Sequence, residues 1–313
     1  MARKRKKLRK ARHLLEYTAF LFLLAIVRTL SPRSVHRLGS RLGDLVYSLA
    51  GKRNRIALTN LDIAFGNSKS RQEKKRIIRQ SFRQMAVSAL QCLWLQHNTE
   101  NRIHELFQEE PKGLNRLKEC LSRNKGAFIF SAHYGNWEAM ALYTGYLGVM
   151  RLHSIVRRLD NPWLERAALA FRTRSGNGIF YREDSPLKIV RALKNNSCVA
   201  VMMDQNTALN GVFVDFFGIP AATPRSVALL SYKLGTPVLP VFPHANGDGT
   251  YTIEIMPEIR LEKTGHKESD ILALTQQYQK VLEAVIHDHP QSWMWAHRRW
   301  KTRPPHERGK KIY

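Results

Sequence analysis

Apolar residues at helical spacing dominate the first third of the chain. From Val35 to Leu49 they recur every three or four positions, which predicts a helix that ends before Gly51. A second stripe over residues 77–95 predicts another helix, and ordinary core packing is the simplest explanation of its apolar face. Because strand patterns are scarce in this region, we expect residues 31–110 to form a helical lead-in packed on the core.

The pattern changes after Pro111 to short apolar runs that alternate with helical stretches. The apolar runs predict strands over residues 127–131, 154–156, 199–203, 238–242 and 251–256. The helical stretches cover residues 137–146, 161–173, 186–193, 225–234 and 270–286. This alternation is typical of the α/β fold class, in which helices cover a mostly parallel central sheet. No Gly-rich phosphate loop, internal repeat or low-complexity linker interrupts it, so we expect one α/β core over residues 111–313.

Basic residues precede an apolar stretch at the N-terminus. Eight Lys or Arg residues lie within residues 3–12, and residues 14–27 carry only one charge, at Glu16. This stretch is shorter than the ~20 residues that cross a bilayer comfortably, although tilt and extension to Leu30 would narrow the gap. No small-residue cleavage site follows, which argues against a secretory signal peptide. We expect residues 1–30 to be a basic N-terminus with a membrane anchor helix that spans the bilayer or lies in its interface; the alternative is a buried helix of a soluble protein.

A formal net charge of +26 predicts an acidic partner. Nucleic acid is disfavoured because there is no helix-turn-helix signature, zinc spacing or aromatic RNA-binding tract, and much of the basic excess lies beside the apolar N-terminal stretch. A non-enzymatic nucleic-acid-binding protein remains the distant alternative. The three cysteines, Cys92, Cys120 and Cys198, are far apart and odd in number. They indicate a reducing compartment and argue against a disulfide framework or a metal site.

Candidate chemistry lies just after the strand predicted over residues 127–131. His133 follows this strand, and Glu138 lies at the start of the next predicted helix. Histidine has the pKa best suited to removing a proton near neutral pH, and a carboxylate at its far ring nitrogen would fix the tautomer. On a regular helix, positions five apart point in different directions, so the two side chains meet only across a strand–turn–helix junction. Gly135 permits such a turn and Asn136 caps the helix, so we interpret the pair as a general base and its orienting carboxylate.

The spacing alone is weak support, because it also arises by chance in a chain with 12 histidines and 25 acidic residues. It joins His104 to Glu109 as well. That second pair lies in a polar helical stretch with no strand before it, so we interpret His104 as a solvent-exposed residue on a helix face. The alternative interpretation of His133 is a hydrogen-bonded histidine of the core.

Further motifs follow one another in a fixed order along nearly the whole chain. They are the N-terminal apolar helix, residues 53–61 (Arg-Asn-Arg-Ile-Ala-Leu-Thr-Asn-Leu), Ala64-Phe65, His133 to Glu138 as His-x-x-x-x-Glu, Asp160-Asn161-Pro162, Arg174, Met203-Asp204-Gln205, residues 213–218, Thr223 and the tract Trp-Ala-His-Arg-Arg-Trp-Lys that begins at Trp295. In this order they resemble the late acyltransferases of lipid A biosynthesis, bacterial inner-membrane enzymes that add secondary acyl chains to the growing lipid. Gly66 stands where the family pattern has proline, which changes a turn rather than the chemistry.

The resemblance implies a reaction. His133 would take the proton from a hydroxyl of an acyl chain already on the lipid A precursor, and the alkoxide would attack an acyl thioester. Acyl carrier protein is the expected donor and coenzyme A the alternative, with no other cofactor and no metal. Glu138 would orient His133 and offset its transient positive charge. For the tetrahedral oxyanion, Arg174 is the first candidate donor and Arg157 the second, although each could equally be an exposed charge or a phosphate contact.

Other residues in the same motifs are candidates for substrate binding. Asp204 and Gln205 end an apolar strand, where open α/β sheets present functional groups, although Asp204 could equally cap or bridge loops. Asn136 is a possible substrate contact, but we favour a helix cap. The aromatic and basic tract over residues 293–300 fits either an interfacial patch or a structural tail packed on the core.

The resemblance also implies partners and a location. We expect acyl carrier protein, an anionic glycolipid acceptor and inner-membrane phospholipids as partners, with the catalytic domain on the cytoplasmic face of a bacterial inner membrane. Related enzymes acylate mannosylated phosphatidylinositol and ornithine lipids, so another membrane lipid is the alternative acceptor. A hydrolase is the remaining rival, but the Gly-x-Ser-x-Gly elbow of serine hydrolases is absent from the sequence.

Overall fold

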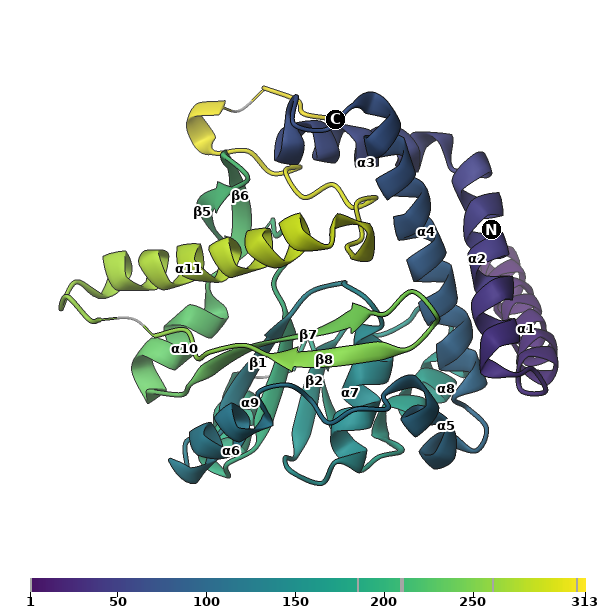
Figure 1. Cartoon of the computed structure of the whole chain (residues 1–313), viewed down its shortest axis with the longest axis horizontal. Coiled ribbons are helices and arrows are strands. Elements are labelled where there is room, and N and C mark those ends of the chain that lie inside the picture. Colours follow the sequence, from purple (N-terminus) through teal and green to yellow (C-terminus); the bar gives the residue numbers. More distant parts are fainter. Residues whose placement is uncertain (1, 185, 209–210, 261, 308) are drawn as a thin grey trace.

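The elements before the first strand are all helices in the computed structural model (Figure 1). The structure describes residues 2–184, 186–208, 211–260, 262–307 and 309–313. The helices of this part are α1 (Ala2–Val27), α2 (Pro32–Leu49), α3 (Gly51–Phe65), α4 (Arg71–Trp94), α5 (Thr99–Leu106) and α6 (Leu114–Ser122). The two helices predicted from apolar spacing are confirmed as α2 and α4. Gly51, predicted only as a break, is the first residue of α3.

The central sheet has six strands in the order β3-β2-β4-β1-β7-β8, and every neighbouring pair is parallel except β7 and β8. Its strands are β1 (Ala127–Ser131), β2 (Leu152–Val156), β3 (Gly178–Tyr181), β4 (Cys198–Met202), β7 (Val238–Ala245) and β8 (Tyr251–Ile255). The helices of this part are α7 (Trp137–Tyr146), α8 (Pro162–Thr173), α9 (Pro186–Lys194), α10 (Ser226–Leu234) and α11 (Lys267–Asp288), with short 3₁₀ turns at Pro290–Ser292 and Pro305–Glu307. The predicted α/β class with a mostly parallel sheet is confirmed.

Three strands were not predicted. β3 is a short edge strand of four residues, too short for its apolar residues to form a clear pattern. The other two, β5 (Gly211–Phe216) and β6 (Ile219–Pro224), form a separate antiparallel hairpin. Phe217 and Gly218 join them with φ angles of 53° and 77°, and two positive φ angles suit the tight two-residue turn of a hairpin. A phenylalanine at such a position gives no turn signal in the sequence.

The core lies on both faces of the sheet, and β1 contributes to each. Phe128 and Phe130 belong to the cluster that includes α3, α10, α11 and the C-terminal tract. Ala127 and Ile129 belong to the cluster that includes α5, α6, α7 and α8. Side chains on a strand alternate between faces, so a strand covered on both sides is apolar throughout. This explains why residues 127–131 form one continuous apolar run in the sequence.

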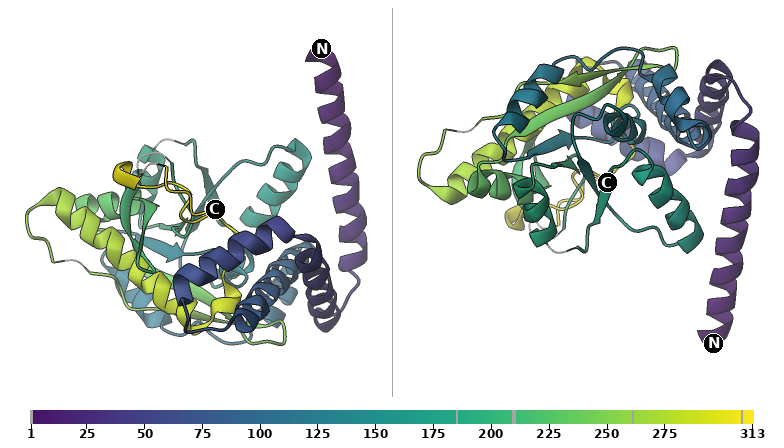
Figure 2. Two further views of the ribbon diagram at one scale, coloured as in Figure 1. Left: turned by 90° about the horizontal axis from the view of Figure 1, so that it is seen from above. Right: turned by 90° about the horizontal axis from the view of Figure 1, so that it is seen from below.

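The N-terminal helix α1 contains the stretch expected to anchor the chain. Among the helices that the structure describes, none combines the length and apolar character needed to cross a bilayer. The basic first half of α1 leaves only residues 14–27 apolar, about 21 Å of helix against a hydrocarbon layer of about 30 Å. The expectation of a spanning helix is therefore unsupported. Figure 2 shows α1 as a long helix that extends along one side of the molecule.

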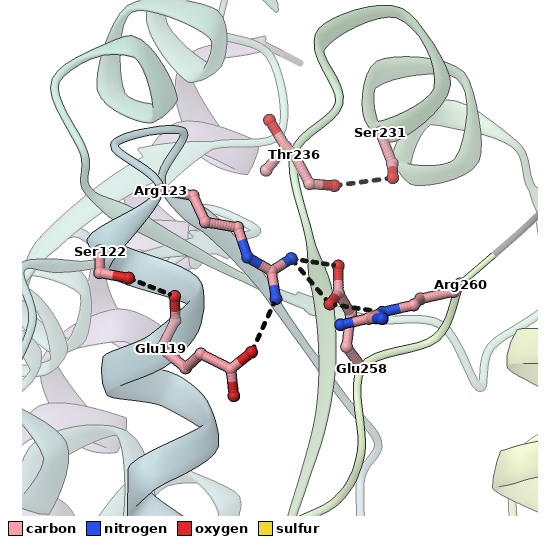
Figure 3. Close-up of polar contacts among 7 residues, drawn as sticks. All are labelled: Glu119, Ser122, Arg123, Ser231, Thr236, Glu258 and Arg260. Carbon is pink, nitrogen blue, oxygen red and sulfur yellow. Dashed lines mark hydrogen bonds and ion pairs between the residues drawn. The ribbon is translucent and has the colours of Figure 1, made fainter.

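An ion-pair network joins α6 to the segment after β8 (Figure 3). Arg123 donates to both carboxylate oxygens of Glu258, at 2.8 and 3.1 Å, and to Glu119 at 3.3 Å. Arg260 donates to Glu258 at 3.0 Å. These contacts lie at the end of the sheet where β1 and β7 begin, opposite the end at which His133 lies. We therefore assign them a structural role.

Candidate functional site

His133 and Asp204 meet because the strands before them are neighbours. β1 and β4 pair in parallel, with Ser131 opposite Met202 at their carboxyl ends. His133 and Asp204 each lie two residues beyond these positions, so the register brings them side by side. This is the edge at which open α/β sheets present functional groups.

Asp204 binds His133 at both the backbone and the ring. Its Oδ2 accepts the backbone N–H of His133 at 3.0 Å, and its Oδ1 lies 2.9 Å from the ring Nδ1. The indole N–H of Trp293 donates to the same carboxylate at 2.9 Å. The second ring nitrogen of His133, Nε2, lies 3.4 Å from the side-chain amide nitrogen of Gln205. A proton on Nδ1, directed at the carboxylate, leaves Nε2 with the lone pair that a base needs.

The charges of this pair stabilise each other. Burial lowers the pKa of His133, but the charge and hydrogen bond of Asp204 outweigh burial and raise this pKa above its ordinary value. Burial raises the pKa of Asp204, but contacts with His133 and Trp293 outweigh it and bring this pKa to about 2. Asp204 therefore stays ionised at neutral pH and would stabilise an imidazolium at His133.

The C-terminal tract fixes the turn that carries His133. The backbone N–H of Met294 donates to the His133 carbonyl at 3.1 Å, and that of Gly135 donates to the Ser292 carbonyl at 3.0 Å. Gly135 has φ +54°, and a Cβ at this position would collide with the carbonyl of Pro243. Glycine is therefore required at this turn for both its backbone conformation and its small size.

Glu138 lies in the first turn of α7, but its hydrogen-bond partner is Arg172 of α8. The guanidinium donates to the two carboxylate oxygens at 2.9 and 2.5 Å. The carboxylate that contacts the His133 ring is Asp204, so the predicted direct contact between His133 and Glu138 is replaced by an ion pair between two helices. The bidentate guanidinium holds Glu138 toward α8, and Glu138 acts on His133 only through its charge, which raises the His133 pKa after the larger effects of burial and Asp204.

Arg172 is a residue that the sequence did not single out. Its carboxylate partner lies on a different helix, 34 residues away in the chain. In the sequence it resembles any basic residue of an amphipathic helix, and the neighbouring Arg174 matched the family motif instead. Only the packing of α7 against α8 distinguishes the two arginines.

The Glu138–Arg172 pair predicts a measurable coupling. We expect Glu138→Gln and Arg172→Gln each to lower the free energy of unfolding by about 1–3 kcal/mol, because each leaves a half-buried group without its charged partner. The double variant should be less destabilised than the sum of the two, by about 1 kcal/mol or more. Denaturant unfolding of the four proteins measures this coupling, and additive effects would contradict it.

Asn136 caps the start of α7, which is the role that we favoured for it in the sequence analysis. Its side-chain oxygen accepts the backbone N–H of Ala139 at 3.1 Å at the start of α7. Its amide nitrogen donates to Gln91 of α4 at 2.9 Å, and the side chain is buried. Both ends of the amide are therefore engaged within the protein.

The two arginines predicted as oxyanion donors differ in their contacts and exposure. Arg174 follows α8 and donates to the Gln96 carbonyl at 2.5 Å and to the Thr99 hydroxyl at 2.8 Å, which joins α8 to the turn between α4 and α5. Arg157 is exposed directly after β2. Because β2 and β1 flank β4 and are parallel to it, Arg157 lies at the same sheet edge as His133.

The aromatic tract is a structural tail and not an interfacial patch. Trp293, Trp295 and Trp300 are fully buried in the core. The rings of Trp293 and Trp295 meet edge to face with centroids 4.7 Å apart, and Trp293 and Trp300 both pack on Phe216 of β5. Tertiary packing, which the composition of the tract does not reveal, decides between the two predicted alternatives.

Arg299, in the same tract, is a fully buried cation. Its guanidinium donates to the Thr223 hydroxyl at 2.6 Å, to the Gln279 side chain at 3.0 Å and to the Gln205 carbonyl at 3.5 Å. Burial lowers its pKa to about 10, and the charge of Asp204 opposes this effect. Arg299 therefore places a positive charge behind the loop that carries Asp204 and Gln205.

A cavity of about 350 Å³ opens beside the Glu138–Arg172 pair. Its apolar wall comes from α1, α4, α7 and α8 and includes Phe20, Met85, Leu93, Trp137, Leu164 and Phe171. The ring of Trp137 also meets the ring of His133 edge to face, with centroids 5.0 Å apart. The cavity therefore reaches the turn that carries His133, and its size and lining suit an apolar chain.

A histidine–carboxylate pair beside an apolar cavity suits the activation of a hydroxyl for chemistry on an acyl chain. The sequence profile of bacterial lipid A biosynthesis acyltransferases matches residues 2–302, and the chain belongs to this family. It is 27% identical over 274 residues to the lipid A biosynthesis palmitoleoyltransferase of Escherichia coli K12, covering 85% of each chain. It is 26% identical over 278 residues to the lauroyltransferase of the same organism, covering 86% of each chain.

The chain is also similar to acyltransferases that are named for a different lipid. The chain is 25% identical over 196 residues to the phosphatidylinositol mannoside acyltransferase of Mycobacterium tuberculosis H37Rv, covering 60% of this chain and 58% of that one. Together with the family assignment, this similarity supports an O-acyltransferase that acts on lipids.

Proposed function

We propose that this protein transfers a fatty acyl chain from an acyl thioester to a hydroxyl of a lipid A precursor, with His133 as the general base. The observation that carries the proposal is the pair of His133 and Asp204 at the carboxyl edge of the sheet, next to the apolar cavity. The relatives named as lipid A acyltransferases support the choice of acceptor.

The proposed reaction is a direct transfer. His133 Nε2 takes the proton of the acceptor hydroxyl, while Asp204 holds Nδ1 and offsets the charge of the imidazolium. The alkoxide attacks the thioester carbonyl, the new carbon–oxygen bond forms, and the carbon–sulfur bond breaks. The leaving thiolate then takes the proton from His133. Asp204 thus has the orienting role that the sequence suggested for Glu138.

The oxyanion of the tetrahedral intermediate needs hydrogen-bond donors. Gln205 is our first candidate, because its amide nitrogen lies 3.4 Å from His133 Nε2. Arg157 is the second, since it is exposed at the same sheet edge. Arg174 would first have to release its contacts with Gln96 and Thr99 to take this role.

The cavity is the proposed site of the acyl chain, and a larger side chain in its wall should shorten the preferred chain. Ala168 of α8 lines the cavity, and its replacement by phenylalanine fills part of that space. We expect kcat/KM for the longest accepted donor to fall about tenfold or more, with shorter donors less affected. Ala170→Phe is the matched control, because Ala170 is exposed on the same helix. Equal chain-length profiles for the two variants would contradict the assignment.

Acyl carrier protein is the proposed donor and coenzyme A the alternative thioester. A formal net charge of +26 favours association with a strongly acidic carrier and with an anionic glycolipid. We place the protein at the cytoplasmic face of a bacterial inner membrane, where both substrates meet phospholipids.

A specific observation supports a second acceptor class. The similarity to phosphatidylinositol mannoside acyltransferases raises another membrane lipid as the acceptor with the same base. A panel assay separates the two. The purified protein is incubated with acyl carrier protein or coenzyme A thioesters and with a lipid A precursor, a mannosylated phosphatidylinositol or an ornithine lipid, and products are identified by mass spectrometry. We expect product with the lipid A precursor. Product with another lipid alone would make that lipid the proposed acceptor.

A further inference from the structure

The peptide group between Gln205 and Asn206 is held at both of its polar atoms. It follows directly after Asp204, at the carboxyl edge of the sheet. Its N–H, which belongs to Asn206, donates to Nε2 of His297 at 3.1 Å. Its carbonyl, which belongs to Gln205, accepts from the guanidinium of Arg299 at 3.5 Å. Two residues of the C-terminal tract therefore fix the plane of this peptide.

Side chains on both sides of the peptide are held by the same end of the chain. Asp204 accepts the indole N–H of Trp293 at 2.9 Å. The Asn206 side chain exchanges two hydrogen bonds of 3.0 Å with Thr302: its oxygen accepts the Thr302 backbone N–H, and its nitrogen donates to the hydroxyl. Gln205 lies between these two anchors, and its side-chain amide nitrogen faces Nε2 of the proposed base at 3.4 Å.

The backbone of His297 is itself fixed by helix α3. Asn60 of this helix is fully buried, and its amide nitrogen donates to the His297 and Trp295 carbonyls at 2.7 Å each. The amide oxygen of Asn60 accepts the Tyr313 hydroxyl at 2.6 Å. The backbone N–H of Arg299 donates to the His297 carbonyl at 3.0 Å. A ring carried by such a backbone can act as a fixed hydrogen-bond acceptor.

The ring of His297 must be neutral to accept the backbone N–H. A ring nitrogen accepts only when it carries a lone pair, so the proton of this imidazole lies on Nδ1. Burial lowers the pKa of His297 to about 4, and the charge of Asp204 opposes this effect. The nearby guanidinium groups of Arg299 and Arg53 lower this pKa further. His297 therefore stays neutral over the pH range in which His133 titrates.

We propose that His297 is a positioning residue for acyl transfer, which holds the Gln205–Asn206 peptide so that the Gln205 amide faces Nε2 of His133. The contact is made to the backbone, so it sets the direction in which the Gln205 side chain projects. A rotation of this peptide would turn the amide away from the base while Asp204 kept its contacts with the ring. The inference rests on the proposed function, because His297 acts through Gln205 in the same reaction.

Two amide substitutions of His297 differ in whether they restore the acceptor. In His297→Gln the amide oxygen reaches the position of Nε2, whereas in His297→Asn it ends near the position of Nδ1. We expect His297→Asn to lower kcat for transfer to a lipid A precursor roughly 10–100-fold, with a much smaller change in KM, because a small displacement of a positioned group slows the chemical step strongly. His297→Gln should recover most of this loss.

The pH profile and a matched control separate positioning from general damage. The acidic limb of kcat/KM should stay at the wild-type pH in His297→Asn, because His297 is neutral in the wild type. His306→Asn is the control, since His306 is exposed in the same C-terminal region, and it should retain the wild-type rate. An equal loss of kcat in His297→Asn and His297→Gln would overturn the positioning role and leave a structural one.

Hydrogen exchange of the resting full chain measures the contact without acyl transfer. In His297→Asn and His297→Leu, mass spectrometry of a peptide that covers residues 203–207 should show the Asn206 N–H exchanging about tenfold or more faster than in the wild type. His297→Gln should exchange near the wild-type rate. Unchanged exchange in both of the first two variants would overturn the proposed contact.

The two measurements also distinguish this inference from the proposed function. Absence of acyl transfer by the wild type to any acceptor would overturn the proposed function, and the role of His297 in the reaction with it. Full kcat of His297→Asn and His297→Leu in an active enzyme would overturn the role of His297 alone.

Discussion

His133→Gln should reduce acyl transfer by roughly 10²–10⁴-fold, the range for loss of a positioned general base. Glutamine keeps a polar side chain of similar reach at this position but has no basic lone pair near neutral pH. The backbone N–H of residue 133 still donates to Asp204 in this variant, so the turn held by Met294 and Ser292 should persist. Initial rates on a lipid A precursor, with circular dichroism of both proteins, measure the effect.

The chain supplies a matched control for this variant. His104 has the same spacing to a glutamate as His133 but is exposed on α5, where its ring meets Tyr143 edge to face. His104→Gln should therefore transfer acyl chains at the wild-type rate. A similar loss in both variants would indicate general damage to the protein, and full activity of His133→Gln would contradict the role of His133 as base.

Asp204→Asn should cost roughly 10³–10⁴-fold in kcat, because an amide neither fixes the Nδ1–H tautomer nor stabilises the imidazolium. The pH profile gives a second readout. In the wild type the contacts with Asp204 raise the pKa of His133, so kcat/KM should rise with pH through a value above the ordinary ~6.5. Without the carboxylate, burial dominates and lowers this pKa, and the acidic limb of the variant should move to lower pH.

This variant also decides which carboxylate orients the base. Glu138→Gln leaves the contact between His133 and Asp204 intact, so the acidic limb of its pH profile should move less than that of Asp204→Asn. The reverse order, with a larger pH shift in Glu138→Gln, would contradict the assignment of Asp204 and restore the pairing suggested by the sequence.

The local parts of the site followed from the sequence. β1 and α7 lie over the residues predicted for them, because a strand covered on both faces is continuously apolar and Asn136 marks the helix start. These signals depend only on neighbouring residues. The position of His133 at the end of a strand could therefore be predicted before any strand order was known.

The partner of His133 could not be predicted in the same way. Asp204 lies 71 residues further along the chain, and it reaches the ring only because β4 inserts between β2 and β1. Nothing in the local sequence specifies that strand order. The nearer Glu138 matched the family motif, but the packing of α8 gave its carboxylate a bidentate guanidinium from Arg172 instead.

The composition of the C-terminal tract also did not predict whether its side chains are buried. Trp295 and Arg299 belong to a tract whose aromatic and basic residues suit either a membrane interface or a core, and the structure buries both. Arg299 is accommodated because Thr223, Gln279 and backbone carbonyls accept its hydrogen bonds. These acceptors come from a hairpin and a helix that are distant in sequence, so the accommodation depends on the complete fold.

The most direct test of the proposed function is one measurement of acyl transfer by the purified, detergent-solubilised protein. A lipid A precursor is incubated with an acyl-loaded acyl carrier protein and either the wild type or His133→Gln, and the lipid is analysed by mass spectrometry. The proposed mechanism predicts a product heavier by one acyl group with the wild type and almost none with the variant. Equal product from both proteins, at matched folding, would contradict it.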